Sequence, residues 1–129
     1  MAENLISPEL LNSYISFTDE CLTKLETQLI SLNPNKPEDS KLRHEIFAVF
    51  HDIKGMGGSF NYPLMTSAGT SICRYLRLLD DNSPLDKNLI EAHVKTMRII
   101  MENKIMGSGD TTGTELINRL NELVDHSLA

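Results

Sequence analysis

A histidine and a lysine lie one helical turn apart at His51 and Lys54, and glycines follow at positions 55, 57 and 58. At pH 7 a histidine with the ordinary pKa of about 6.5 has a free nucleophilic nitrogen. A lysine ammonium group is a compact positive charge that neutralises anionic oxygens. The segment therefore combines a nucleophile and a cation with unusually little side-chain bulk.

The helix that must position these residues is predicted to span about 38–60, between a proline-rich break at 33–37 and the break Asn61-Tyr62-Pro63. At 100° per residue its apolar side chains form one stripe, which we expect to face the core: Leu42, Ile46, Val49, Ile53, Met56 and Phe60. His51 lies about 180° from the centre of that stripe and is therefore expected to face solvent. The other residues on its side of the wheel are His44, Phe47, Ala48, Lys54, Gly55 and Gly58.

The glycines admit two interpretations. Each costs about 0.8–1 kcal/mol relative to alanine inside a helix. In one interpretation the helix ends at Gly55, which is then a C-cap glycine. In the other, which we favour, the helix continues, and Gly55 and Gly58 clear the side that carries His51. Another protein's backbone can then approach the imidazole closely.

The segment HDIKGMGGSF at 51–60 resembles the signature of histidine-containing phosphotransfer (Hpt) domains. That signature is H-x-x-K-G with a small residue three positions after the glycine, then an apolar residue and a turn. It maps onto His51, Lys54, Gly55, Gly58 and Phe60. The family usually has glycine where this chain has Asn61. Asparagine also tolerates a left-handed backbone, so we expect the turn to be kept.

The resemblance implies a phosphorelay intermediate. In such a protein the imidazole accepts a phosphoryl group from a receiver-domain aspartate and passes it to another receiver. By the same resemblance, His51 is the phosphoryl acceptor and Lys54 stabilises the phosphoryl charge, because this chemistry depends mainly on positioning and charge neutralisation. The chain needs no cofactor of its own, since the divalent metal belongs to the partner receiver. Without an ATP-binding glycine loop it is expected to have no kinase activity.

The expected docking residues beside His51 are Phe47, Ala48, Gly55 and Gly58. An exposed phenylalanine next to glycines could anchor a partner. Alternatively, Phe47 packs against a neighbouring helix at the edge of the core.

Composition limits the other function classes. The chain has 129 residues, 40% of them hydrophobic and 23% charged, which is typical of one globular domain spanning 1–129. A net charge of −6 disfavours binding to nucleic acid or an anionic membrane. No apolar run approaches the roughly 18 residues of a membrane span, and we see no secretory signal. The cytoplasm is the expected location.

Helical periodicity recurs along the whole chain. Helices are predicted from Pro8 to near Leu32, from Pro63 to just before Asp81, from Leu85 to Met106, and after a loop at 107–111. No stretch alternates with period two, so the predicted class is all-α. Short connections favour an up-and-down antiparallel four-helix bundle with one additional helix. The additional element is the first helix, part of it, or a flanking helix, and periodicity does not decide.

The remaining reactive side chains favour ordinary roles. His44 could tune the site but is expected to be solvated, His93 to be half-buried in the core, and His126 to lie in a fraying end. Cys21 and Cys73 are expected to pack as small apolar residues. No Glu-x-x-His pair occurs, so a metal site is not expected.

The predicted function is therefore a monomeric phosphorelay intermediate that binds receiver domains of a hybrid histidine kinase or a response regulator. The alternative is a non-catalytic helical adaptor that binds a signalling partner through the same face. His51 distinguishes the two, because docking alone does not require it.

Overall fold

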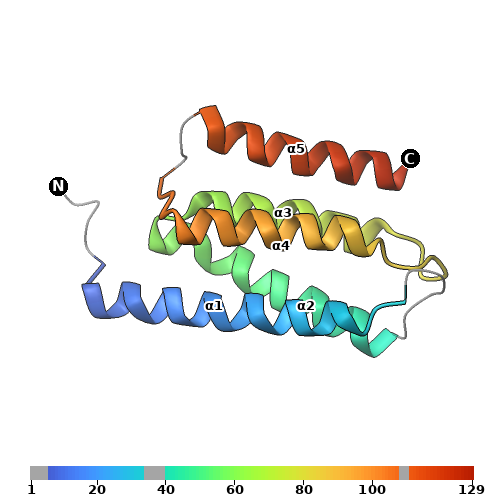
Figure 1. Ribbon diagram of the computed structural model, residues 1–129, viewed down its shortest axis with the longest axis horizontal. Helices are drawn as coiled ribbons and strands as arrows, with labels where there is room; N and C mark the ends of the chain where they lie inside the picture. Colours follow the sequence, from blue (N-terminus) through green and yellow to red (C-terminus); the bar gives the residue numbers. More distant parts are fainter. Residues whose placement is uncertain (1–5, 34–39, 108–110) are drawn as a thin grey trace.

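The computed structural model describes residues 6–33, 40–107 and 111–129, and this part of the chain is helical with no strand. Figure 1 shows its α-helices, which are α1 (Pro8–Ile30), α2 (Ser40–Gly57), α3 (Pro63–Leu78), α4 (Lys87–Glu102) and α5 (Thr111–Leu128). A 3-10 turn, η2 (Gly58–Phe60), follows α2 directly. The predicted all-α class is confirmed.

Side-chain caps fix two of the helix starts. The Ser7 hydroxyl accepts a hydrogen bond of 3.1 Å from the Leu10 amide, and Pro8 occupies the first turn of α1, as predicted. In α4, the carboxylate of Asp86 accepts from the Leu89 amide at 3.1 Å. Asp86 itself has an extended backbone, so the helix begins at Lys87 and not at the predicted Leu85.

The ends of three helices also differ from prediction. The first helix stops at Ile30, two residues before the predicted end, and the second ends at Gly57, because the 3-10 turn η2 takes the place of its last predicted residues. The predicted start of the second helix near Glu38 lies outside the described residues. The fourth ends at Glu102 and not at Met106, and Lys104 has a positive φ of 51° that no continuing helix allows.

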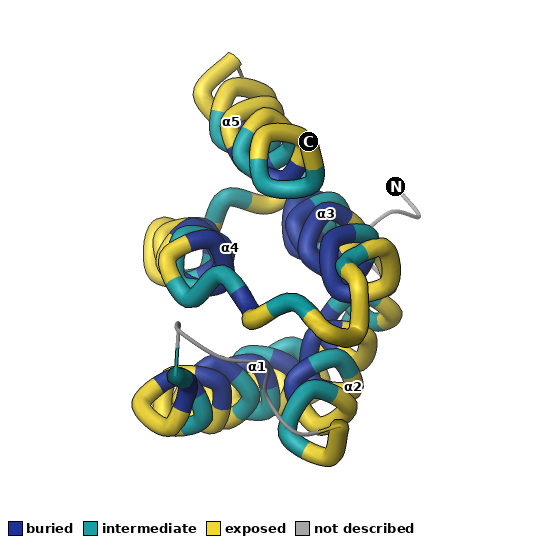
Figure 2. The backbone as a smooth tube through the Cα atoms, turned by 90° about the vertical axis from the view of Figure 1, so that its right-hand side faces the viewer, coloured by how far each residue is buried: buried dark blue, intermediate teal, exposed yellow. Residues whose placement is uncertain are grey.

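The helices pack in a closed order around the core. α1 contacts α2 and α4, and α3 contacts the same two helices from the other side. α5 packs on α3 and α4, so it lies outside this ring, as the end-on view in Figure 2 shows. In Figure 1 the colours show that successive helices run in alternating directions.

The buried face of α2 is wider than one stripe. Ile46, Val49 and Ile53 are buried as predicted, while Leu42, Met56 and Phe60 are half-buried and pack against the core. Phe50 is fully buried although it lies outside the predicted stripe. The physical reason is that α2 packs against both α1 and α3, so two adjacent faces of the helix are buried.

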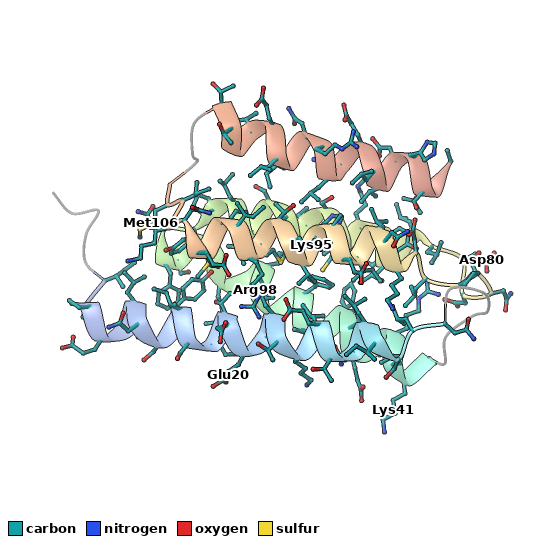
Figure 3. All side chains as sticks on the ribbon, in the orientation of Figure 1. Glu20, Lys41, Asp80, Lys95, Arg98 and Met106 are labelled. Carbon is teal, nitrogen blue, oxygen red and sulfur yellow. The ribbon has the colours of Figure 1, made fainter. Side chains whose placement is uncertain are left out.

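Arg98 joins α4 to α1 on the outside of the bundle, and Figure 3 shows it between the two helices. Its guanidinium group donates hydrogen bonds to Glu26 at 2.9 and 3.1 Å, to Thr23 at 3.0 Å and to the carboxylate of Asp19. These two carboxylates and the hydroxyl hold α1 against α4. Among the described residues, no helix is long and apolar enough to cross a membrane.

Candidate functional site

The exposed side of α2 carries the predicted site residues together. His51, Ala48, Gly55 and Gly58 are exposed, and Lys54 is half-buried. The face predicted from the helical wheel is therefore present, with the imidazole exposed well inside a long helix.

Gly55 and Gly58 have no packing reason to be glycine. A Cβ atom added to either would meet nothing within 4 Å, and α2 continues through Gly55 to Gly57. Among the described glycines only Gly107 has a positive φ, so the C-cap interpretation of Gly55 is wrong. The two positions leave open space on the side of the helix where His51 lies.

Two other glycines are required by packing. Gly57 was noted in the sequence without a reason of its own, and Gly69 was not noted. A Cβ at Gly57 would lie 2.7 Å from both the Thr66 hydroxyl and the Tyr62 carbonyl oxygen. A Cβ at Gly69 would lie 2.7 Å from Cβ of Lys54. Gly69 thus lets α3 approach the backbone of α2 directly beside the site lysine. The position of Gly69 inside an apolar helical pattern is the sequence feature that could have predicted this close contact.

Thr66 is a further residue that the sequence analysis missed. Its hydroxyl donates to the carbonyl oxygen of Lys54 at 2.9 Å and accepts from the amide of Gly58 at 3.1 Å. Thr66 therefore links α3 to the point where α2 changes into the 3-10 turn.

Phe47 combines features of both predicted roles. It is half-buried and packs against the core, as the structural interpretation expects. Its ring also stacks with the imidazole of His51, with centroids 5.9 Å apart and planes inclined by 27°. The contact limits the space that the imidazole can occupy on that side.

The turn after the site is kept despite Asn61. This residue has φ 66° and ψ 33°, the left-handed conformation expected of it. The Tyr62 amide donates to the Gly57 carbonyl at 2.8 Å, and Pro63 then occupies the first turn of α3. Phe60 stacks on Tyr14 of α1 at a centroid distance of 4.5 Å, which fixes the end of the α2–η2 segment to the core.

The other histidines do not join the site. His44 is exposed two turns from His51, and its Nδ1 lies 2.8 Å from the Ser40 carbonyl oxygen. His93 is fully buried and not half-buried as predicted, with Nδ1 2.9 Å from the Leu89 carbonyl oxygen and Nε2 3.0 Å from the Ser71 hydroxyl. Burial lowers the pKa of His93 to about 4, so this imidazole is neutral at pH 7. His126 belongs to the last turn of α5.

The cysteines pack much as expected. Cys73 is buried, and Cys21 is half-buried against the core. Burial raises the pKa of both thiols, so neither is a reactive thiolate. Within the described ranges, no three His, Cys, Asp or Glu side chains lie close enough to hold a metal ion.

Comparison with known proteins identifies a family. The model of the family described as "Hpt domain" matches residues 9–126, which is nearly the whole chain and includes every residue of the exposed α2 face. No curated protein and no solved structure matches the chain.

Proposed function

The chain belongs to the Hpt domain family, whose members take part in phosphorelay signalling and interact with receiver domains, and on this premise we propose that it carries a phosphoryl group between receiver domains on His51. A receiver aspartyl phosphate is the donor, and an aspartate of a second receiver is the acceptor. The chain itself has the role of a carrier with no kinase activity.

The proposed step is an in-line displacement at phosphorus. The lone pair of a neutral imidazole nitrogen of His51 forms the N–P bond, while the bond between phosphorus and the aspartate oxygen breaks. The carboxylate leaves with its electron pair. The second transfer reverses these bonds on another receiver. A divalent ion held by the receiver supplies charge neutralisation from the partner's side.

Lys54 and the small residues have distinct parts in this proposal. The ammonium group of Lys54, one turn from His51, neutralises the phosphoryl oxygens. Ala48, Gly55 and Gly58 let the receiver backbone come close, and Phe47 contributes apolar contact at the edge of the docking face. The open space at the two glycines supports this division.

The observation that carries the proposal is the exposed imidazole of His51 beside two helix positions where an added Cβ meets nothing. Gly55 lies inside α2 and weakens that helix by about 0.8–1 kcal/mol relative to alanine. Close approach of a partner to the imidazole explains both glycines together. A non-catalytic adaptor using the same face is the alternative, and it leaves the exposed nucleophile without a purpose.

We also propose that α1–α4 form an up-and-down four-helix bundle and that α5 is the additional helix. The packing of α1 and α3 on both α2 and α4 supports this assignment. In it, the docking face lies on α2, away from α5. The expected working form is one copy of this single domain in the cytoplasm.

Transfer from a phosphorylated receiver tests the function. A receiver domain is charged with labelled acetyl phosphate, separated from it, and mixed with the chain. We expect label on the chain that is labile to acid and stable to base, as for a phosphorus–nitrogen bond. The matched controls are His51→Gln, which should accept no label, and His126→Gln, in the last turn of α5, which should accept it normally. Binding of the receiver without transfer would instead support the adaptor.

A further inference from the structure

Positive charge is concentrated on the two helices around the site. The chain as a whole carries 12 Lys and Arg against 18 Asp and Glu. In α2 and α3 the balance is reversed, because their only acidic residues are Glu45 and Asp52. The basic residues of these helices are Lys41, Arg43, Lys54, Arg74 and Arg77. The rest of the chain is therefore strongly acidic, and the α2–α3 side is its cationic side.

A groove of about 420 Å³ lies between α2 and α3 on that side, and it continues from the site. Phe47, whose ring stacks with His51, forms part of its wall. The other lining residues are Ser40, Arg43, His44, Leu76, Arg77 and Asp81. A partner that reaches the imidazole along α2 therefore meets this groove within two helical turns.

The two arginines of the groove have different environments. The guanidinium group of Arg43 donates to the carbonyl oxygens of Leu76, Leu79 and Asp80, at 3.3, 2.7 and 3.3 Å, and so caps the end of α3. These three hydrogen bonds hold the guanidinium group in place. Arg77 is exposed and forms no ion pair with any residue that the structure describes. By contrast, Arg74, one turn earlier, pairs with Asp125 of α5 at 2.8 Å.

The charge of Arg77 acts on the same region as the charge of Lys54. Both lower the pKa of the buried Cys73 thiol of α3, although burial raises it overall. Lys54 lies against Gly69 of α3, and Arg77 lines the groove together with Phe47, so both cations lie where α2 and α3 meet. Asp81 is the opposing charge at the rim of the groove.

We propose that this groove is a second contact site for the receiver domain and takes a segment that presents an Asp or Glu carboxylate next to an apolar side chain. Arg77 pairs with the carboxylate, and Phe47 and Leu76 pack against the apolar group. Charge complementarity and continuity with the His51 face select this occupant. The contact sets which receivers dock, while the phosphoryl step stays at His51. This inference rests on the proposed function.

The test measures the transfer rate from a phosphorylated receiver over a range of receiver concentrations. The variants are Arg77→Glu and a matched charge reversal, Arg119→Glu, at an exposed position of α5 outside the groove. We expect Arg77→Glu to raise the KM for the receiver about tenfold with little change in kcat, and to weaken the salt dependence of KM. Arg119→Glu should change KM less than about twofold. Asp81→Asn should lower KM, because it removes the opposing charge.

Equal KM values for Arg77→Glu and Arg119→Glu would contradict the groove and leave the transfer function intact. A wild-type chain that accepts no phosphoryl group would contradict the proposed function and the groove with it. A fall in kcat without a change in KM for Arg77→Glu would also overturn the docking role, because it would place Arg77 in the chemical step.

Discussion

The hydroxyl of Thr66 on α3 donates a hydrogen bond of 2.9 Å to the carbonyl oxygen of Lys54 on α2, and it accepts one from Gly58. This contact ties the end of the site helix to its neighbour where α2 changes to a 3-10 turn. Gly69 allows it, because no Cβ separates α3 from Lys54 there. The position of the site lysine therefore depends on two residues of the next helix.

Thr66→Val keeps the shape of the side chain and removes the hydroxyl. We expect the free energy of unfolding to fall by about 1–2 kcal/mol, because the Lys54 carbonyl and the Gly58 amide each lose a hydrogen bond to the hydroxyl. Hydrogen exchange at the Gly58 amide should accelerate, and phosphoryl transfer should slow. Thr66→Ser should restore both. Unchanged exchange at Gly58 in Thr66→Val would show that the hydroxyl does not hold the end of α2.

Gly55→Gln should fold normally, because an added side chain there meets nothing within 4 Å. Transfer should fall sharply, since the long side chain occupies the receiver's path to His51. Gly58→Ala should raise the free energy of unfolding by up to about 1 kcal/mol. Thermal melts and the transfer assay on the same samples measure both effects.

Gly69→Ala is the matched control for crowding. Its Cβ would lie 2.7 Å from Cβ of Lys54, so it should destabilise the protein by about 1–3 kcal/mol. If Gly55→Gln were as destabilised as Gly69→Ala and still transferred at the normal rate, the glycine face would have a structural and not a docking role.

Lys54→Ala should slow transfer and shorten the half-life of the phosphohistidine, because one positive charge near the phosphoryl oxygens is lost. Receiver binding should weaken only modestly. Lys95→Ala, at an exposed lysine of α4 (Figure 3), removes the same charge away from the site and should have neither effect. The rate and the half-life are both read from loss of label over time. Identical values for the two variants would make Lys54 an ordinary surface lysine.

His93 predicts a pH dependence of stability. Its pKa is about 4 in the folded protein, against about 6.5 for the ordinary group. Between these pH values the unfolded chain binds a proton at His93 that the folded chain excludes. The contribution of His93 to the free energy of unfolding is therefore fully present above about pH 6.5 and falls as the pH decreases toward 4. The loss from this group is about 3 kcal/mol. Denaturant unfolding of the wild type and of His93→Gln measures it.

The comparison isolates His93 from the carboxylates, which titrate in both proteins. The wild type should lose more stability than His93→Gln between pH 6.5 and 4. Parallel stability curves would mean that the imidazole is protonated in the folded protein at these pH values.

Helical periodicity and breaker residues predicted the helical class and the order of the helices. The capping and turn residues have the predicted roles at the starts of the first and third helices and in the turn between the second and third: Ser7, Pro8, Asn61 and Pro63. The predicted boundaries of the fourth helix were wrong. The helix starts after the capping carboxylate of Asp86 and ends before Lys104, which has a left-handed backbone, and the spacing of apolar residues predicts neither feature. The burial of Phe50 depends on a second neighbour of α2, which no single-helix wheel contains.

The exposed face of the site was predictable from helical periodicity, because His51, Gly55 and Gly58 lie opposite the apolar stripe of a single helix. The residues that position this face were not. Thr66 and Gly69 belong to α3, and their contacts with α2 arise only when the two helices pack. The groove that Arg77 lines is likewise formed only by that packing.

The most direct test of the central claim is to locate the phosphoryl group after transfer. The chain is incubated with a phosphorylated receiver, kept at alkaline pH, digested, and sequenced by tandem mass spectrometry. The account predicts phosphate on the peptide that contains His51, on that residue, and none on His44 or His126. Phosphate on another residue, or equal labelling of a His51→Gln variant, would contradict the assignment of His51 as the phosphoryl acceptor.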